Sequence, residues 1–89
     1  MRVSTKGRYG LRAMVDLAEH EEGKAIPIRE ISERQNISEQ YLEQLFATLR
    51  KAELVKSVRG AHGGYMLNHE ADEISVADII TTLEGPIAP

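Results

Sequence analysis

The sequence predicts a small, mostly α-helical domain that carries one β-hairpin. Apolar residues recur at helical spacing in four segments of the 89-residue chain. A glycine-rich stretch, residues 60–64, separates two short β-prone segments. At this length we expect a single hydrophobic core and one folded unit over residues 1–84, with residues 85–89 beginning a linker.

The first helix is expected to begin at Ser4 or Thr5, which are good N-cap residues, and to end between His20 and Gly23. Two glycines near its start weaken this prediction. The residues at i, i+3, i+4 and i+7 predict its buried stripe as Leu11, Met14, Val15 and Ala18.

The central part of the chain predicts two helices joined by a tight turn. A short extended piece, residues 25–28, leads into a helix over Ile28–Gln35. Ser38 is a good N-cap for the next helix, Glu39–Ala52, which has the clearest pattern in the chain. Its expected buried stripe is Leu42, Leu45, Phe46 and Leu49. The opposite face carries Gln40, Gln44, Ala47 and Lys51, with Glu43 and Arg50 on one flank.

The last part of the chain predicts a hairpin and a final helix. The two strands fall at residues 54–59 and 65–67, joined by the flexible loop 60–64. Ser75 and Asp78 form a near capping box for the final helix. Its expected inward residues are Val76, Ile79, Ile80 and Leu83.

The order of these elements defines the fold class, a winged helix-turn-helix. Two helices joined by a tight turn precede a basic, glycine-tipped hairpin, which is the wing. The major groove of duplex DNA is about 12 Å wide and admits one helix. We therefore expect the helix Glu39–Ala52 in the major groove and the wing, residues 55–67, beside it in the minor groove.

The formal net charge of −3 is an average over blocks of opposite sign. Residues 1–12 carry four bases and no acid, and residues 50–68 carry four bases and one acid. The other two blocks are acidic. Because local patches rather than totals attract a phosphate backbone, the negative net charge does not exclude DNA binding. Candidate phosphate contacts are Lys6, Arg8, Arg50, Lys51 and Lys56.

The composition favours binding over chemistry. The chain has no cysteine, so these residues form no disulfide and no thiolate-bound metal centre. The three histidines lie far apart, and the loop 60–64 lacks the Lys-Ser/Thr pair of a phosphate-binding loop. We expect no catalytic residue, no metal, no cofactor and no enzyme activity in this chain. Without a signal peptide or a long apolar run, we expect a cytoplasmic protein with no membrane contact.

Three longer segments carry a family resemblance. They are Val3–Gly10, the stretch Ile37–Leu45 followed by Leu49-Arg50-Lys51, and the wing segment Leu54–Tyr65. In this order they resemble the bacterial winged-helix transcription regulators of the IscR/CymR type, over essentially the whole chain. The resemblance implies a dimeric, sequence-specific DNA-binding regulator with Glu39–Ala52 as its recognition helix.

The resemblance also implies roles for single residues. The family positions that face bases are here Gln40, Glu43 and Gln44, and those near phosphates are Ser38, Tyr41 and Arg50. Arg59 matches the wing-tip arginine that enters the minor groove, and we assign His62 at the same tip to the wing contact. Glutamine can pair with adenine, and a glutamate can accept from cytosine and reject other bases. The alternative interpretation is that these polar side chains only face solvent, and that Tyr41 only packs against its neighbours.

One departure from the family concerns the C-terminal end. Cluster-binding members carry three cysteines beyond the wing, before a long dimerisation helix, and this chain stops near that point. We expect a fragment of a longer regulator, with a naturally short member as the alternative. The full-length protein is expected to be a homodimer, and this chain a weakened dimer or a monomer. An iron–sulfur cluster is expected only if cysteines follow residue 89.

The sequence therefore predicts a DNA-binding transcription regulator, a repressor, that addresses a pseudo-palindromic site in double-stranded DNA. The alternative is a winged helix that binds another protein. Such modules have an apolar or acidic outer face on the third helix. Here that face is polar and carries Lys51, with Arg50 beside it, which favours DNA.

Overall fold

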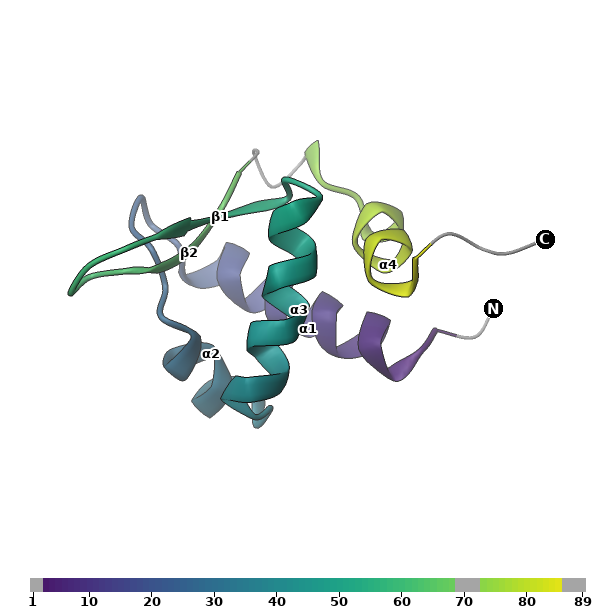
Figure 1. The fold of residues 1–89 in the computed structure, drawn as a ribbon, viewed down its shortest axis with the longest axis horizontal. Coiled ribbons are helices and arrows are strands. Elements are labelled where there is room, and N and C mark those ends of the chain that lie inside the picture. Colours follow the sequence, from purple (N-terminus) through teal and green to yellow (C-terminus); the bar gives the residue numbers. More distant parts are fainter. Residues whose placement is uncertain (1–2, 69–72, 86–89) are drawn as a thin grey trace.

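The computed structural model describes residues 3–68 and 73–85, and these form a helix-turn-helix with a two-stranded wing. The winged helix-turn-helix prediction is therefore confirmed. In Figure 1, α3 crosses α1 near the centre, the hairpin projects to one side, and α4 lies on the other. The elements are α1 (Thr5–His20), α2 (Ile28–Gln35), α3 (Glu39–Lys51), β1 (Val55–Val58), β2 (Gly64–Leu67) and α4 (Val76–Glu84).

Serine side chains begin three of the four helices in the described parts of the chain. The Ser4 hydroxyl accepts from the Gly7 N–H at 3.0 Å, and the Ser38 hydroxyl accepts from the Tyr41 N–H at 3.1 Å. Ser75 and Asp78 form a complete capping box at α4. These contacts satisfy backbone donors that have no partner inside the helix, so the predicted helix starts are confirmed.

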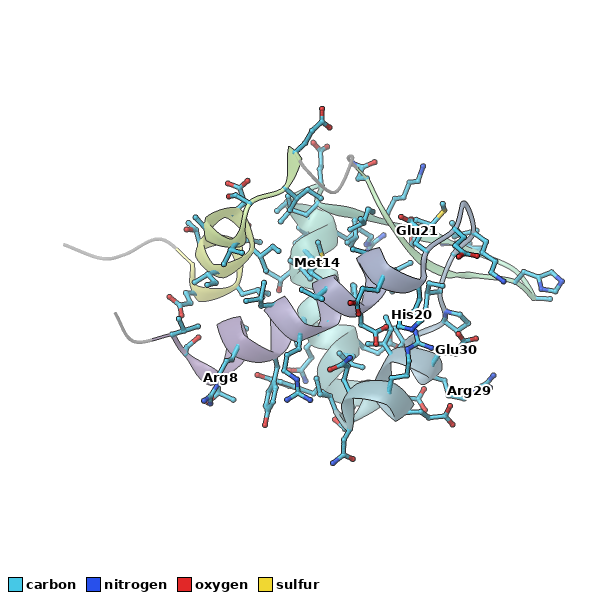
Figure 2. All side chains as sticks on the ribbon, turned by 180° about the vertical axis from the view of Figure 1, so that it is seen from behind. Arg8, Met14, His20, Glu21, Arg29 and Glu30 are labelled. Carbon is cyan, nitrogen blue, oxygen red and sulfur yellow. The ribbon has the colours of Figure 1, made fainter. Side chains whose placement is uncertain are left out.

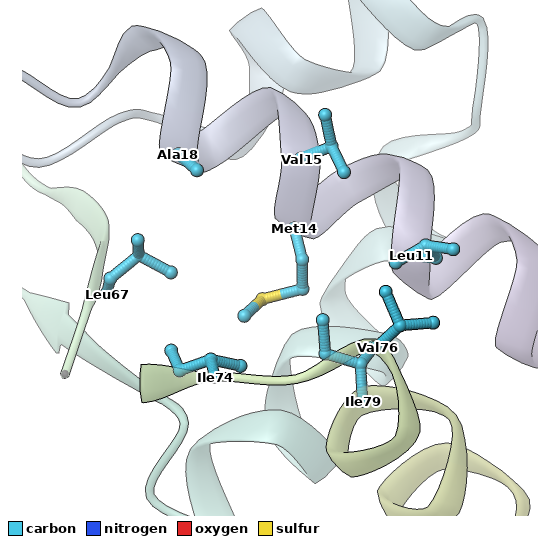
Figure 3. Close-up of a pocket in the computed structure, with 8 residues that line it drawn as sticks. All are labelled: Leu11, Met14, Val15, Ala18, Leu67, Ile74, Val76 and Ile79. Atoms are coloured by element: carbon cyan, nitrogen blue, oxygen red, sulfur yellow. The ribbon is translucent and has the colours of Figure 1, made fainter. Parts of the chain in front are cut away.

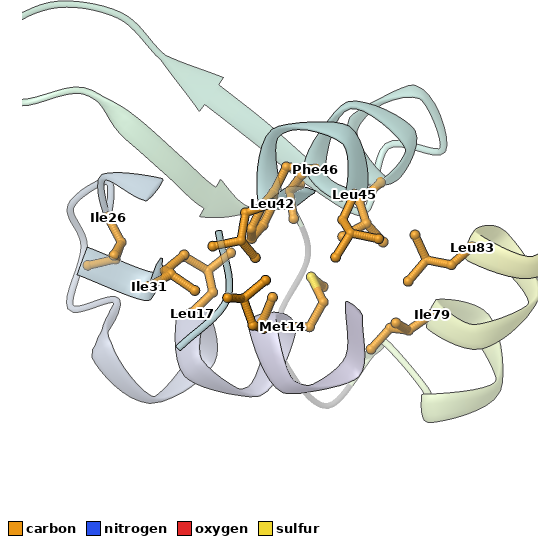
Figure 4. Packing of buried hydrophobic residues seen from close by; sticks show 13 residues of the cluster. Met14, Leu17, Ile26, Ile31, Leu42, Leu45, Phe46, Ile79 and Leu83 are labelled. Carbon is orange, nitrogen blue, oxygen red and sulfur yellow. The ribbon is translucent and has the colours of Figure 1, made fainter. Parts of the chain in front are cut away.

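The core is centred on α3 (Figure 4). Its predicted stripe, Leu42, Leu45, Phe46 and Leu49, is fully buried. Around it pack apolar side chains from the other helices, from β1 and from the segment before α2. These are Ala13, Met14, Leu17, Ile26, Ile31, Ile37, Val55, Ile79 and Leu83.

The predicted buried stripe of α1 is wrong in part. Met14 is buried, but Val15 is 48% exposed and Ala18 is exposed as well. The face that enters the core is turned by one position and contains Gly10, Ala13 and Leu17 instead. The glycine and alanine have little or no side chain, so α1 can approach its neighbours closely along this face.

The predicted inward position of Val76 is also wrong, since this residue is 55% exposed. Val76 instead lines an apolar groove between α1, α4 and the end of β2 (Figure 3). Val15 and Ala18, the exposed residues of the predicted α1 stripe, line the same groove. Its lining residues are Leu11, Met14, Val15, Ala18, Leu67, Ile74, Val76 and Ile79.

The start of α1 packs closely against the end of α4. At Gly10, an added Cβ would lie 1.9 Å from Leu83 Cδ1, so the two helices meet here without room for a side chain. The Ser4 N–H donates to Glu84 Oε2 at 2.8 Å, and hydrogen bonds from Ser4 hold the pKa of Glu84 below its ordinary value. The glycine that weakened the helix prediction is thus a packing site.

The first strand of the hairpin is two residues shorter than predicted, the second is one residue longer, and the tip is shifted by one residue. The strands pair in antiparallel register from Val55 opposite Leu67 to Val58 opposite Gly64. Residues 59–63 connect them, so Arg59 lies in the tip rather than in a strand. The extended piece before α2 adds one bridge, between Ile26 and Tyr65.

None of the helices in the described parts of the chain is long and apolar enough to cross a membrane. Most of the predicted linker, residues 86–89, lies outside the described residues, as does the link 69–72 between the hairpin and α4.

Replacing Gly10 with alanine is expected to destabilise the protein, although alanine is the better helix former by about 1 kcal/mol. The new Cβ has to displace Leu83, which is buried. Urea unfolding should show a net loss of about 1–2 kcal/mol. In a Leu83→Ala background the same change should cost little. An equal loss in both backgrounds would show that this contact is not the cause.

Candidate nucleic-acid interface

The outer face of α3 presents the three residues predicted to read bases. Gln40, Glu43 and Gln44 are all exposed. Their exposure follows from the amphipathic pattern of the helix, because the opposite stripe is fully buried in the core. Two carboxamides and one carboxylate therefore form a surface of hydrogen-bond donors and acceptors with few apolar atoms.

Basic side chains flank this face on both sides. Arg50 and Lys51 are exposed in the last turn of α3, and Lys56 is exposed in β1. Lys6 and Arg8 are exposed in the first turns of α1, where Arg8 Nη2 lies 3.5 Å from Thr5 Oγ1. The wing and the start of α1 extend to opposite sides of α3 (Figure 1). The predicted phosphate contacts thus form two groups rather than one patch.

The start of α3 carries the other two predicted phosphate contacts. The Ser38 oxygen accepts from the Tyr41 N–H, and its hydroxyl hydrogen remains a donor for a second partner. The Tyr41 ring is half-buried and packs edge-on against Tyr9, with centroids 5.8 Å apart. Tyr41 therefore has a packing role, and its contact with a phosphate stays a prediction.

The wing is attached to the body at Tyr65. Its N–H and C=O pair with the C=O and N–H of Ile26, both at 2.9 Å, and its ring stacks on Phe46 at 4.7 Å. At Gly64 an added Cβ would lie 2.2 Å from the Ile26 carbonyl oxygen, so only glycine fits this approach. Beyond this point, Arg59 and His62 are exposed at the tip.

Polar side chains of α1 hold the turn between α2 and α3. Asn36 adopts the left-handed conformation at φ 56° that ends α2. Arg12 donates to the backbone carbonyl of Gln35 and, at 3.3 Å, to its side-chain oxygen. The Arg12 guanidinium also lies over the Tyr9 ring, 5.3 Å from its centroid. The position of α3 thus depends on α1.

A buried carboxylate completes this network. Asp16 is fully buried. Arg34 donates to its carboxylate through Nε at 3.0 Å and Nη2 at 2.8 Å, which is a bidentate pairing. Gln35 Nε2 donates at 2.9 Å, and His20 Nδ1 lies 3.6 Å away. Burial alone would raise the pKa of Asp16. The hydrogen bonds from Arg34 and Gln35, with the charges of Arg34 and His20, outweigh it and lower the pKa below 3.8.

The sequence pattern does not assign a supporting role to Arg12, Asp16, Arg34 or Gln35, because their partners lie on other elements. One signal was available, because Asp16 lies between Val15 and Leu17 in an apolar part of α1. An acid at such a position is seldom buried without a partner.

Comparisons with known proteins identify the family. The Rrf2 family model, described as an iron-dependent transcriptional regulator, matches residues 3–89. The chain belongs to the Rrf2 family. Among curated Rrf2-type relatives, the HTH-type transcriptional regulator CymR of Bacillus subtilis is 56% identical over 90 residues, which cover 100% of this chain and 64% of CymR. The regulator IscR of Sodalis glossinidius is 54% identical over 87 residues, which cover 98% of this chain and 53% of IscR.

Solved structures agree with this assignment to the Rrf2 family. The structure of CymR, described as the global cysteine regulator of B. subtilis, matches with a TM-score of 0.92 at 52% identity, over 100% of this chain and 69% of that chain. The structure of T. potens IscR matches with a TM-score of 0.88 at 57% identity, over 99% of this chain and 64% of that chain. The chain thus spans only part of the length of these proteins.

The family description names iron, which iron–sulfur proteins hold chiefly through cysteine thiolates. The chain has no cysteine. Within residues 3–68 and 73–85, no three histidine or acidic side chains gather closely enough to hold a metal ion. The residues present therefore do not fit an iron–sulfur cluster, whose ligands are chiefly cysteine thiolates.

Replacing Asp16 with asparagine is expected to reduce the free energy of unfolding by about 1.5–3 kcal/mol, because a charged, buried hydrogen-bond acceptor is lost. The pKa of Asp16 is lowered in the folded state, so its contribution is present above pH 3.8 and disappears as the pH falls further. Urea unfolding of both proteins over a pH series measures this difference.

The matched control is Glu30→Gln, which removes the second, half-exposed partner of Arg34, at 3.6 Å. This change should cost less than about 1 kcal/mol. A difference between the wild type and Asp16→Asn that stays constant below pH 3.8 would contradict the assigned ionisation of Asp16.

Proposed function

We propose that this Rrf2 chain is the DNA-binding domain of a sequence-specific transcription regulator. The regulator is a repressor that acts in the bacterial cytoplasm. The observation that carries the proposal is the exposed polar face of α3 with basic side chains on both sides. The names of the relatives, HTH-type transcriptional regulators, support it. The mechanism is binding, and no residue is assigned to catalysis.

In this proposal different parts of the surface contact the base edges, the minor groove and the phosphates. Gln40, Glu43 and Gln44 read base edges in the major groove, where donors and acceptors form a distinct pattern for each base pair. The wing reads the minor groove through Arg59, because a guanidinium favours the narrow groove of A·T-rich DNA, and His62 contacts the adjacent backbone. The residues that fix the register on phosphates are Lys6, Arg8, Ser38, Tyr41, Arg50, Lys51 and Lys56.

We further propose that the full-length protein is a homodimer on a pseudo-palindromic site. Residues 1–84 form the DNA-binding domain, and residues 85–89 begin the linker to the dimerisation segment. Two observations support this arrangement. The relatives are longer than this chain, and the apolar groove along α1 and α4 exposes Val15 and Val76. This chain alone should form a weakened dimer or a monomer, and an iron–sulfur cluster belongs to the protein only if cysteines follow residue 89.

The salt dependence of binding to duplex DNA tests the proposal against a protein-binding winged helix. Each phosphate contact made by a lysine or arginine releases counterions, so the five such contacts proposed for each protomer should give a log–log slope of about −4.5 per bound protomer. Affinity for a selected site and for random duplex should both fall as salt rises. Binding to neither duplex at low salt would favour the protein-binding alternative.

Replacing Glu43 with alanine should relax base preference at one position in each half-site by about 1–3 kcal/mol, because the carboxylate no longer rejects wrong bases. Selection from a randomised duplex library measures the preference at each position. Glu39→Ala is the control, since it removes an exposed acid from the first turn of the same helix. A Glu43→Ala profile identical to that of the wild type would end this assignment.

A further inference from the structure

Glu21 makes a hydrogen bond to the wing from outside it. The residue directly follows α1, and its own N–H caps that helix by donating to the Leu17 carbonyl at 2.9 Å. Its half-buried carboxylate reaches across to β2, where Oε1 accepts from the Leu67 N–H at 2.8 Å. Figure 2 shows Glu21 at the point where the end of α1 meets the hairpin.

This hydrogen bond continues the pairing along the outer edge of β2. Backbone groups of alternate residues in a strand point to the same edge. The outer groups of Tyr65 pair with Ile26, and the next outer donor along β2 is the Leu67 N–H. The Glu21 carboxylate therefore takes the place that a third strand would occupy, and the segment 21–26 covers this edge at two points.

Two points of attachment hold the outer edge of β2, while its inner edge pairs with β1. If the outer edge were held only at Tyr65, the hairpin could pivot about the paired backbone of Ile26 and the stacked ring of Phe46. The bond at Leu67 lies two residues away, on the side opposite the tip. The tip begins four residues from Leu67, about 13 Å along the strand. A rotation about Tyr65, which lies two residues from the tip and two from Leu67, would therefore move the tip and Leu67 by comparable distances in opposite directions.

We propose that Glu21 is a positioning residue for the wing, whose carboxylate sets the direction of the hairpin and thereby the contribution of Arg59 to sequence preference. The inference rests on the proposed role of the wing in the minor groove. Glu21 does not contact DNA, and it acts only through the backbone of β2. The hydrogen bond is charge-assisted, which makes it stronger than a neutral bond at the same edge.

The test compares the binding of duplexes that share one core site and differ only in A·T-rich or G·C-rich flanks. The ratio of the two dissociation constants is the flank preference. Glu21→Ala should reduce this preference by about fivefold, the equivalent of one hydrogen bond, with core recognition unchanged. Glu21→Gln keeps an acceptor oxygen and should retain most of the flank preference. Glu22→Ala, which removes the exposed neighbouring charge, should leave it unchanged.

A double-mutant cycle with Arg59→Ala separates positioning from general stability. If Glu21 acts through Arg59, the double variant should show the same flank preference as Arg59→Ala alone. A flank preference that falls in Arg59→Ala but not in Glu21→Ala would overturn this inference only. A preference that Arg59→Ala leaves unchanged would overturn the role of the wing, and this inference with it.

Amide hydrogen exchange gives a second readout that needs no DNA. The Leu67 amide should lose protection in Glu21→Ala and keep it in Glu21→Gln, while the Tyr65 amide, paired with Ile26, stays protected in both. Unchanged protection of Leu67 in Glu21→Ala would overturn the inference. Loss of protection at both amides would show that the whole edge unfolds, and would overturn it as well.

Discussion

The burial of one face of α3 is the constraint on which the rest of the structure depends. Leu42, Leu45, Phe46 and Leu49 are fully buried, and every other helix, together with β1, contributes to the cluster around them. Because a helix is rigid, burying this stripe also determines which side chains face away from the core. The proposed reading surface is therefore a consequence of core packing, and it needs no separate interaction to stay exposed.

Polar contacts add a second constraint, because they fix the orientation of α2 and α3 relative to α1. Apolar contacts are non-directional, so they permit α2 and α3 to slide relative to α1. The paired groups of Asp16 and Arg34, with the contacts of Arg12 and Gln35, have fixed geometry and allow fewer arrangements. Glu21 does the same for the wing at Leu67. Carboxylates of α1 and its cap thus orient the α2–α3 turn and the wing.

Most of the elements could be predicted because their signals are local. Serine caps at Ser4, Ser38 and Ser75 begin helices through hydrogen bonds to residues three positions away. The apolar stripe of α3 was correctly predicted because only one of its faces is apolar. The stripe of α1 was correct only in part, since both Val15 and Leu17 belong to plausible faces and helical spacing alone does not choose between them.

The sequence by itself determined the order of the elements, their caps and the polar face of α3, because these properties depend on residues within one or two turns of each other. Tertiary structure alone decided which face of α1 enters the core, since the close approach of Gly10 to Leu83 joins residues far apart in the chain. It also decided the partners of Asp16 and Glu21. A carboxylate lies wherever the fold supplies its donors, and those donors come from other elements.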